Sequence, residues 1–154
     1  MKTEKDLEKF VRDNNIPAAV MKEVGESRSS SAAAYTLKVG VERIAKTICL
    51  VADDEFVSVI LPGDKRIDLE KLKTLLRKNR IRLAHDDEII EHTGFEKGGV
   101  PPISYKSKFI IDSSLDPNEE VFCGGGSKDS VLRIKVKDII TIDNPLISDV
   151  LDGV

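Results

Sequence analysis

Two apolar segments separated by a short acidic turn constrain the fold of this chain most. Residues 47–52 and 56–61 are rich in β-branched and aliphatic side chains, and an Asp-Asp-Glu tripeptide separates them. This pattern predicts a β-hairpin. Because nearly every residue of both segments is apolar, with Ser58 interrupting the second, we expect the hairpin to lie centrally, with helices covering both of its faces.

Helical patterns alternate with further extended segments on either side of this hairpin. Thr3 can cap a helix that ends near Asn15, and later patterns predict helices at 29–40, 68–79 and 86–94 and a short helix from Pro145 to Gly153. The extended segments fall at 81–84, 109–112, 121–123 and 131–136. The order predicts an α+β fold, and we expect residues 1–154 to form a single domain.

The composition excludes several classes of protein. The 154 residues include 40% apolar and 33% charged side chains with a net charge of −3, which argues against a disordered chain and against a globally basic nucleic-acid binder. Two cysteines and an N-terminus without an apolar segment point to the reducing cytoplasm. Charges interrupt every apolar run, so we expect a soluble protein without a membrane partner.

Several common catalytic motifs are missing from the sequence. His85 and His92 lack the cysteine or histidine spacing of a metal site, so no metal or other cofactor is expected. The triple glycine at 124–126 lacks the spacing of a phosphate-binding loop, and there is no GxSxG nucleophile motif.

A glycine- and proline-rich loop at 98–102 is the first candidate for a site. Adjacent glycines let the backbone approach a ligand, and prolines hold the loop rigid, so backbone N–H groups could face a carbonyl oxygen or oxyanion. The alternative is an ordinary tight turn.

Three further features carry charge at notable places. Lys46 precedes an apolar strand, where it could bind a substrate carbonyl or phosphate, pair with Asp112, or simply extend to solvent. Residues 65–82 hold eight basic and two acidic side chains, a local charge of +6. We expect Lys71, Arg77 and Lys78 to project from a helix towards solvent, either to bind phosphates or as a plain solvated face.

The order of these landmarks resembles the YbaK/ProX-type aminoacyl-tRNA deacylases, which include relatives of the editing domain of bacterial prolyl-tRNA synthetase. The matching segments are Ser-Ser-Ser-Ala-Ala at 29–33, a Lys-Thr pair ending 41–47, Pro-Gly-Asp within 61–69, Thr-Gly-Phe at 93–95, Gly-Gly-Val-Pro-Pro at 98–102, Asp112 and the glycines at 124–126. The resemblance spans about residues 29–140.

The resemblance implies a mixed, barrel-like β-sheet surrounded by helices and an enzyme that hydrolyses the ester of mischarged tRNA without a metal. It implies catalytic roles for Lys46 and Gly99, and tRNA and prolyl-tRNA synthetase as partners. The implied substrate-binding residues are Gly94, Gly98, Val100, Pro101, Pro102, Asp112, Gly125, Gly126 and Ser127, with tRNA contacts at Lys71, Arg77 and Lys78.

Two departures from the family pattern affect the expected substrate. Val131 falls where bacterial cysteinyl-tRNA(Pro) deacylases carry an aspartate, and residues 17–23 lack their His/Tyr-containing segment. We therefore expect a small aminoacyl group, with alanyl ahead of cysteinyl. The alternative is a non-catalytic module that binds tRNA or a synthetase.

Overall fold

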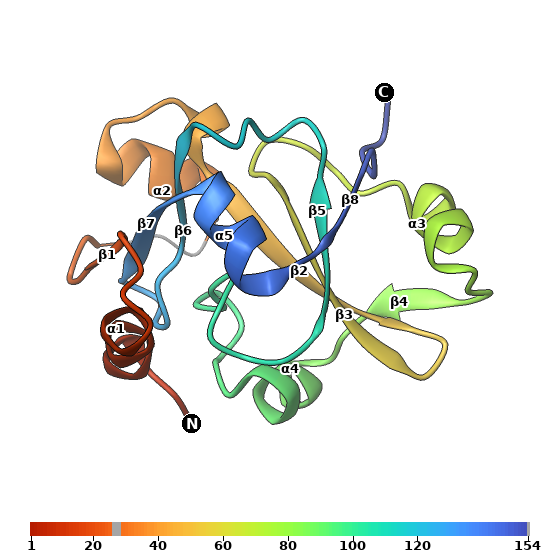
Figure 1. Ribbon diagram of the computed structural model, residues 1–154, viewed down its shortest axis with the longest axis horizontal. Coiled ribbons are helices and arrows are strands. Elements are labelled where there is room, and N and C mark those ends of the chain that lie inside the picture. The colour runs from red at the N-terminus through yellow and green to blue at the C-terminus, as the bar shows by residue number, and fades with distance from the viewer. Residues whose placement is uncertain (26–28, 154) are drawn as a thin grey trace.

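The computed structural model describes residues 1–25 and 29–153 (Figure 1). The helices are α1 (Glu4–Asp13), α2 (Ser30–Leu37), α3 (Leu69–Leu76), α4 (Asp86–Thr93) and α5 (Val136–Asp143), with a 3-10 turn at Val41–Arg43. The strands are β1 (Ala19–Met21), β2 (Ala45–Ala52), β3 (Glu55–Pro62), β4 (Ile81–Leu83), β5 (Lys108–Asp112), β6 (Glu120–Gly124), β7 (Val131–Lys135) and β8 (Leu146–Ser148).

The predicted hairpin is confirmed and forms the centre of a five-stranded sheet. β2 and β3 pair antiparallel from Ala45↔Pro62 to Ala52↔Glu55, within the strand order β4-β2-β3-β5-β8. Asp53 makes the turn possible by adopting a left-handed conformation, with φ of 52°. β5 and β8 extend the sheet in parallel to β3, which gives it a mixed character.

A second sheet lies against the first and completes the α+β fold. It has the order β1-β7-β6 and is antiparallel throughout. A single bridge between Ile44 and Phe122 connects the two sheets. Within residues 1–25 and 29–153 the strands form two open sheets rather than a closed barrel, so the α+β class is confirmed and the barrel-like closure is not complete.

The two faces of the hairpin are buried against different partners. Because side chains alternate along a strand, Leu50 and Leu61 lie on one face, where they pack with Leu72 of α3. Cys49 and Ile60 lie on the other face, in a core shared with the second sheet and helices α1, α4 and α5. Helices therefore cover both faces, as expected, and the second sheet adds to the cover of one of them.

The helix predicted at 145–153 was wrong. The helical segment is α5, just before it, which buries Val136 and Ile139 and ends at Asn144 in a left-handed conformation. Residues 146–148 instead form β8 and pair with β5. The backbone groups of this short segment are satisfied by an available sheet edge, which a local pattern of residues does not reveal.

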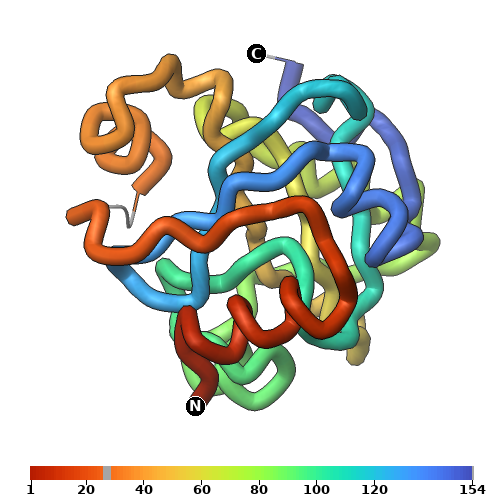
Figure 2. Tube along the Cα trace, turned by 60° about the vertical axis from the view of Figure 1, so that its left-hand side comes forward, coloured from red at the N-terminus to blue at the C-terminus, as the bar shows by residue number. Residues whose placement is uncertain are grey.

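The N-terminal segment contacts two distant loops (Figure 2). The Lys2 N–H donates to the Gly94 carbonyl at 2.7 Å, and the Lys2 ammonium lies 5.6 Å from the centre of the Phe95 ring. Gly126, with φ of +96°, packs so closely that an added Cβ would lie 2.9 Å from the Glu4 Cα. The start of α1 thus supports the loops that follow α4 and β6. In the described part of the chain, no helix has the length and apolar character needed to cross a membrane.

Candidate functional site

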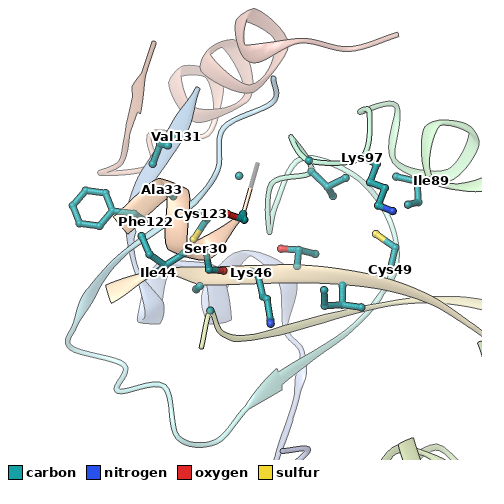
Figure 3. A pocket seen from close by; sticks show the side chains of 18 of the residues that line it. Ser30, Ala33, Ile44, Lys46, Cys49, Ile89, Lys97, Phe122, Cys123 and Val131 are labelled. Atoms are coloured by element: carbon teal, nitrogen blue, oxygen red, sulfur yellow. The ribbon is translucent and has the colours of Figure 1, made fainter. Parts of the chain in front are cut away.

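A cavity of about 550 Å³ lies where α2, β2, α4 and the two glycine loops meet (Figure 3). Its lining comprises Ser29, Ser30, Ser31, Ala33, Ile44, Ala45, Lys46, Thr47, Ile48, Cys49, Gly63, Leu83, Ala84, Ile89, Lys97, Gly98, Val100, Phe122, Cys123, Gly124, Ser130 and Val131. Hydroxyl groups, thiols, two lysines and apolar side chains therefore converge on one space of the size typical of small-molecule sites.

The serine cluster positions one wall of this cavity. The Ser29 hydroxyl accepts a hydrogen bond from the Ala32 N–H at 3.0 Å and so caps the start of α2. Ser30 packs against Gly63, where an added Cβ would lie 2.6 Å from the Ser30 Oγ. The glycine of the Pro-Gly-Asp turn therefore permits α2 to approach the end of β3.

The part of the cavity next to this serine wall is apolar. Ala33, Ile44, Phe122 and Val131 form one buried cluster, and Val131 is only 3% exposed. Arg43 fixes the Phe122 ring from outside, with its guanidinium 5.7 Å from the ring centre. Val131 therefore contributes an uncharged surface to the cavity.

The two cysteines that line the cavity are poor nucleophiles. Burial raises the pKa of the Cys49 thiol to about 12 and that of the Cys123 thiol to about 12. Both thiols are protonated at neutral pH, and the thiolate is the reactive form. Thr47 lies on the same strand face as Cys49, and its buried hydroxyl has no hydrogen-bond partner among the described residues.

Lys46 lies at the edge of the cavity rather than over its floor. Figure 3 shows its side chain on the opposite side of β2 from the Cys49 side chain, as strand alternation requires. Partial burial lowers the pKa of Lys46, while the nearby Asp64 carboxylate acts in the opposite direction. The Lys46 ammonium group therefore lies away from the part of the cavity that Cys49 lines. A ligand can reach it only with a part that extends past β2.

Asp112 lies outside the cavity lining. Its side chain is 1% exposed and accepts hydrogen bonds from the N–H groups of Ser114 and Val150, both at 3.0 Å. The pairing of Lys46 with Asp112 that the sequence left open is not formed. The Asp112 carboxylate accepts backbone hydrogen bonds instead, and the carboxylate that raises the pKa of Lys46 is that of Asp64.

The Gly-Gly-Val-Pro-Pro loop reaches the cavity through Gly98 and Val100. Gly99 lies between them in the sequence, but its Cα faces the Ser127 backbone instead of the cavity. Its N–H donates to the Glu96 carbonyl at 3.0 Å, its carbonyl accepts from Gly126 at 2.8 Å, and an added Cβ would lie 2.9 Å from the Ser127 backbone. Gly99 therefore joins the two glycine loops.

The triple-glycine segment at 124–126 also packs closely against neighbouring backbone, including that of the loop at 98–102. An added Cβ on Gly124 would lie 2.2 Å from the Val100 carbonyl oxygen, and one on Gly125 would lie 2.4 Å from the Ser130 backbone. Of the predicted substrate-binding and catalytic residues, Lys46, Gly98 and Val100 line the cavity, whereas Gly94, Gly99, Pro101, Pro102, Asp112, Gly125, Gly126 and Ser127 lie outside its lining.

The basic helix, α3, packs on the other face of the five-stranded sheet, on the opposite side of the molecule from α2 (Figure 1). Lys71 donates to Asp149 at 2.9 Å and to the Leu151 carbonyl at 2.7 Å, and Lys78 lies 4.0 Å from Glu55. Both lysines are partly exposed to solvent, as expected, and each also lies beside an acidic group from another segment. Arg77 is exposed and caps the end of α3 in a left-handed conformation.

Sequence and structure comparisons agree on the kind of domain. A family described as the aminoacyl-tRNA editing domain matches residues 25–142. The proline–tRNA ligase of Lactobacillus johnsonii is 41% identical over 95 residues, which is 60% of this chain and 17% of the ligase. The ligase of Halalkalibacterium halodurans is 30% identical over 123 residues, which is 79% of this chain and 22% of the ligase.

Two solved structures share the fold over almost the whole chain. A hypothetical protein of 26% identity has a TM-score of 0.87, with 96% of this chain and 99% of that one covered. A candidate trans-editing enzyme for prolyl tRNA synthetase has a TM-score of 0.88 at 24% identity, with 97% of each chain covered.

Proposed function

Because this chain belongs to the aminoacyl-tRNA editing domain family, we propose that it hydrolyses the ester between a small, wrongly attached amino acid and its tRNA. Alanyl-tRNA(Pro) is the first proposed substrate and cysteinyl-tRNA(Pro) the second. The observation that carries this proposal is the cavity itself, whose lining combines an apolar cluster with the glycine loop at Gly98 and Val100.

The lining supports hydrolysis by water instead of by a side-chain nucleophile. Water attacks the ester carbonyl and gives a tetrahedral oxyanion. As this collapses, the bond to the ribose oxygen breaks, and that oxygen takes up the proton released by the water and leaves as a ribose hydroxyl, while the amino acid leaves with a free carboxyl group. The protonated thiols of Cys49 and Cys123 are unsuited to attack. Backbone N–H groups at Gly98 and Val100 are the proposed donors to the developing oxyanion.

Gly99 enters this proposal as a positioning residue. Its hydrogen bonds to Glu96 and Gly126 hold the loop in the conformation that presents its two neighbours to the cavity. Lys46, at the edge, is proposed to hold the ribose or terminal phosphate, so that the ester is oriented towards the loop.

The apolar end supports the preference for a small side chain. Ala33, Phe122 and Val131 are all buried and packed together, so they cannot easily move aside for a bulky group. A valine at this place offers no polar group to a cysteine thiol, which supports the proposed order of alanyl ahead of cysteinyl.

The experiment that tests the function compares initial deacylation rates on alanyl-, seryl-, cysteinyl- and phenylalanyl-tRNA. We expect alanyl-tRNA to react fastest and phenylalanyl-tRNA slowest. Lys46→Ala should slow the reaction at least about tenfold, as loss of a charge-assisted contact does. Lys137→Ala is the matched control, because Lys137 is exposed and outside the cavity lining.

Each outcome of this experiment discriminates between the proposals. No hydrolysis with retained tRNA binding would favour a non-catalytic module that binds tRNA or a synthetase. A fastest rate on phenylalanyl-tRNA would contradict the small-cavity reasoning, and dominance of cysteinyl-tRNA would contradict the role given to Val131. Unchanged turnover in a folded Lys46→Ala variant would remove that residue from the site.

A further inference from the structure

A second cavity, of about 440 Å³, lies between α1, the end of α5 and the segment before β5. Its lining consists of Phe10, Ser104, Tyr105, Lys106, Ser107, Phe109, Ile142 and Asp143. Among the described residues, this lining shares none with the cavity proposed for editing. Its chemistry is also different, since aromatic rings surround one carboxyl group.

Asp143 is the group in this cavity that lacks a partner. It is the last residue of α5, and its buried Oδ2 accepts no hydrogen bond from any described residue. The C-terminal end of a helix is negative, so it offers a carboxylate no stabilisation. Burial raises the pKa of this carboxyl group to about 8. A buried carboxylate normally has a cation or hydrogen-bond donor beside it, and here that place is open.

The aromatic side chains around Asp143 are held in place. The Tyr105 and Phe109 rings lie 5.3 Å apart with their planes tilted by 46°. The Tyr105 hydroxyl donates to the Ser58 Oγ at 3.1 Å, and Ser58 is also 2.9 Å from the Ser107 Oγ. Phe10 adds a third ring from α1. Fixed aromatic faces attract cations through their quadrupoles.

We infer that this cavity binds a small organic ammonium ion, whose positive nitrogen pairs with the Asp143 carboxylate while its alkyl groups pack against Phe10, Tyr105 and Phe109. The carboxylate excludes an anion. A single carboxylate among apolar rings lacks the set of oxygen ligands that a divalent metal needs. Lys106 also lines the cavity, but it is exposed and the structure gives it no ion pair with Asp143.

The test titrates the whole protein at pH 9, where the Asp143 carboxyl group with its pKa of about 8 is ionised, with choline and with its neutral isostere 3,3-dimethylbutan-1-ol. These probes share shape and hydroxyl group and differ in charge. Calorimetry should give a dissociation constant on the order of 1 mM for choline, as one ion pair with ring contacts suggests, and at least about tenfold weaker binding of the isostere. Chemical shifts should change at residues 104–109 and 142–144.

Two variants and a control make the result decisive. Asp143→Asn should weaken choline binding at least about tenfold, while Asp54→Asn, which removes an exposed carboxylate in the hairpin turn, should not change it. Phe10→Leu keeps an apolar side chain but removes one ring, and should weaken binding severalfold. Equal affinity for choline and the isostere, equal affinity of wild type and Asp143→Asn, or absence of saturable binding would each overturn the inference and leave a cavity that holds only water.

Discussion

Replacing Asp143 by asparagine should stabilise the protein at neutral pH. The folded structure raises the pKa of this carboxyl group from 3.8 to about 8 because burial disfavours its charge. Below about pH 4 both the folded and the unfolded chain hold the proton, and the carboxyl group costs nothing. As the pH rises towards 8, the unfolded chain releases the proton and the folded chain keeps it. Stability therefore falls with rising pH over this range.

The size of this effect follows from the shift. One pKa unit corresponds to about 1.4 kcal/mol, so a rise from 3.8 to about 8 costs at most about 4 kcal/mol at pH 7. Water that enters a half-buried site reduces this penalty, and we expect about 1–3 kcal/mol. Asparagine has nearly the same shape and no charge, so Asp143→Asn should recover that amount at pH 7 and change little at pH 4.

Guanidinium denaturation of both proteins at pH 4, 5.5, 7 and 8 measures the effect. The difference in unfolding free energy between variant and wild type should grow with pH across this series. Tyr105, the titratable neighbour, has a pKa raised above its usual value by burial and stays neutral throughout. Parallel stability curves for the two proteins would refute the reasoning, because a buried carboxyl group of ordinary pKa gives no such growth.

Other predictions concern packing, thiol reactivity and tRNA contact. Gly125→Ala should lower the unfolding free energy by about 1–3 kcal/mol in the same denaturation assay, because its Cβ would lie 2.4 Å from the backbone of the next turn. Cys49 and Cys123, with thiol pKa values of about 12, should react slowly with an aromatic disulfide at pH 8 and rapidly in denaturant; fast native reaction would contradict their burial. Lys97→Glu, beside the cavity, should weaken tRNA binding and its salt dependence more than Arg77→Glu on the far face does, and the reverse order in titrations at several salt concentrations would place the tRNA on α3.

The hairpin and the helix caps could be predicted because their signals are local. The two apolar segments pair with each other across the short turn at Asp53. Ser29 caps α2 through the N–H of Ala32, only three residues away. The place of the candidate cavity was also predictable in part, since Lys46 and, from the loop at 98–102, Gly98 and Val100 line it.

The role of Gly99 could not be predicted because it depends on the direction of a missing side chain. A glycine that admits a ligand and one that admits a neighbouring backbone look the same in sequence, and only the fold brings Ser127 to that position. Asp112 presents the same difficulty. A carboxylate after an apolar strand suits a substrate as well as it suits the Val150 N–H, which lies 38 residues further along the chain.

The contact between the N-terminal segment and the glycine loops bears on how this domain can be shortened. The family match begins at residue 25, so a chain trimmed to the matched range would lose Lys2 and Glu4. Gly94 and Gly126 would then lose the backbone that lies against them, although neither is in the deleted part. A purification tag is better attached after Gly153, where an added side chain meets no atom within 4 Å, than ahead of Lys2, whose backbone is already hydrogen-bonded. The range that matches the family is thus shorter than the range whose contacts hold the loops beside the cavity in place.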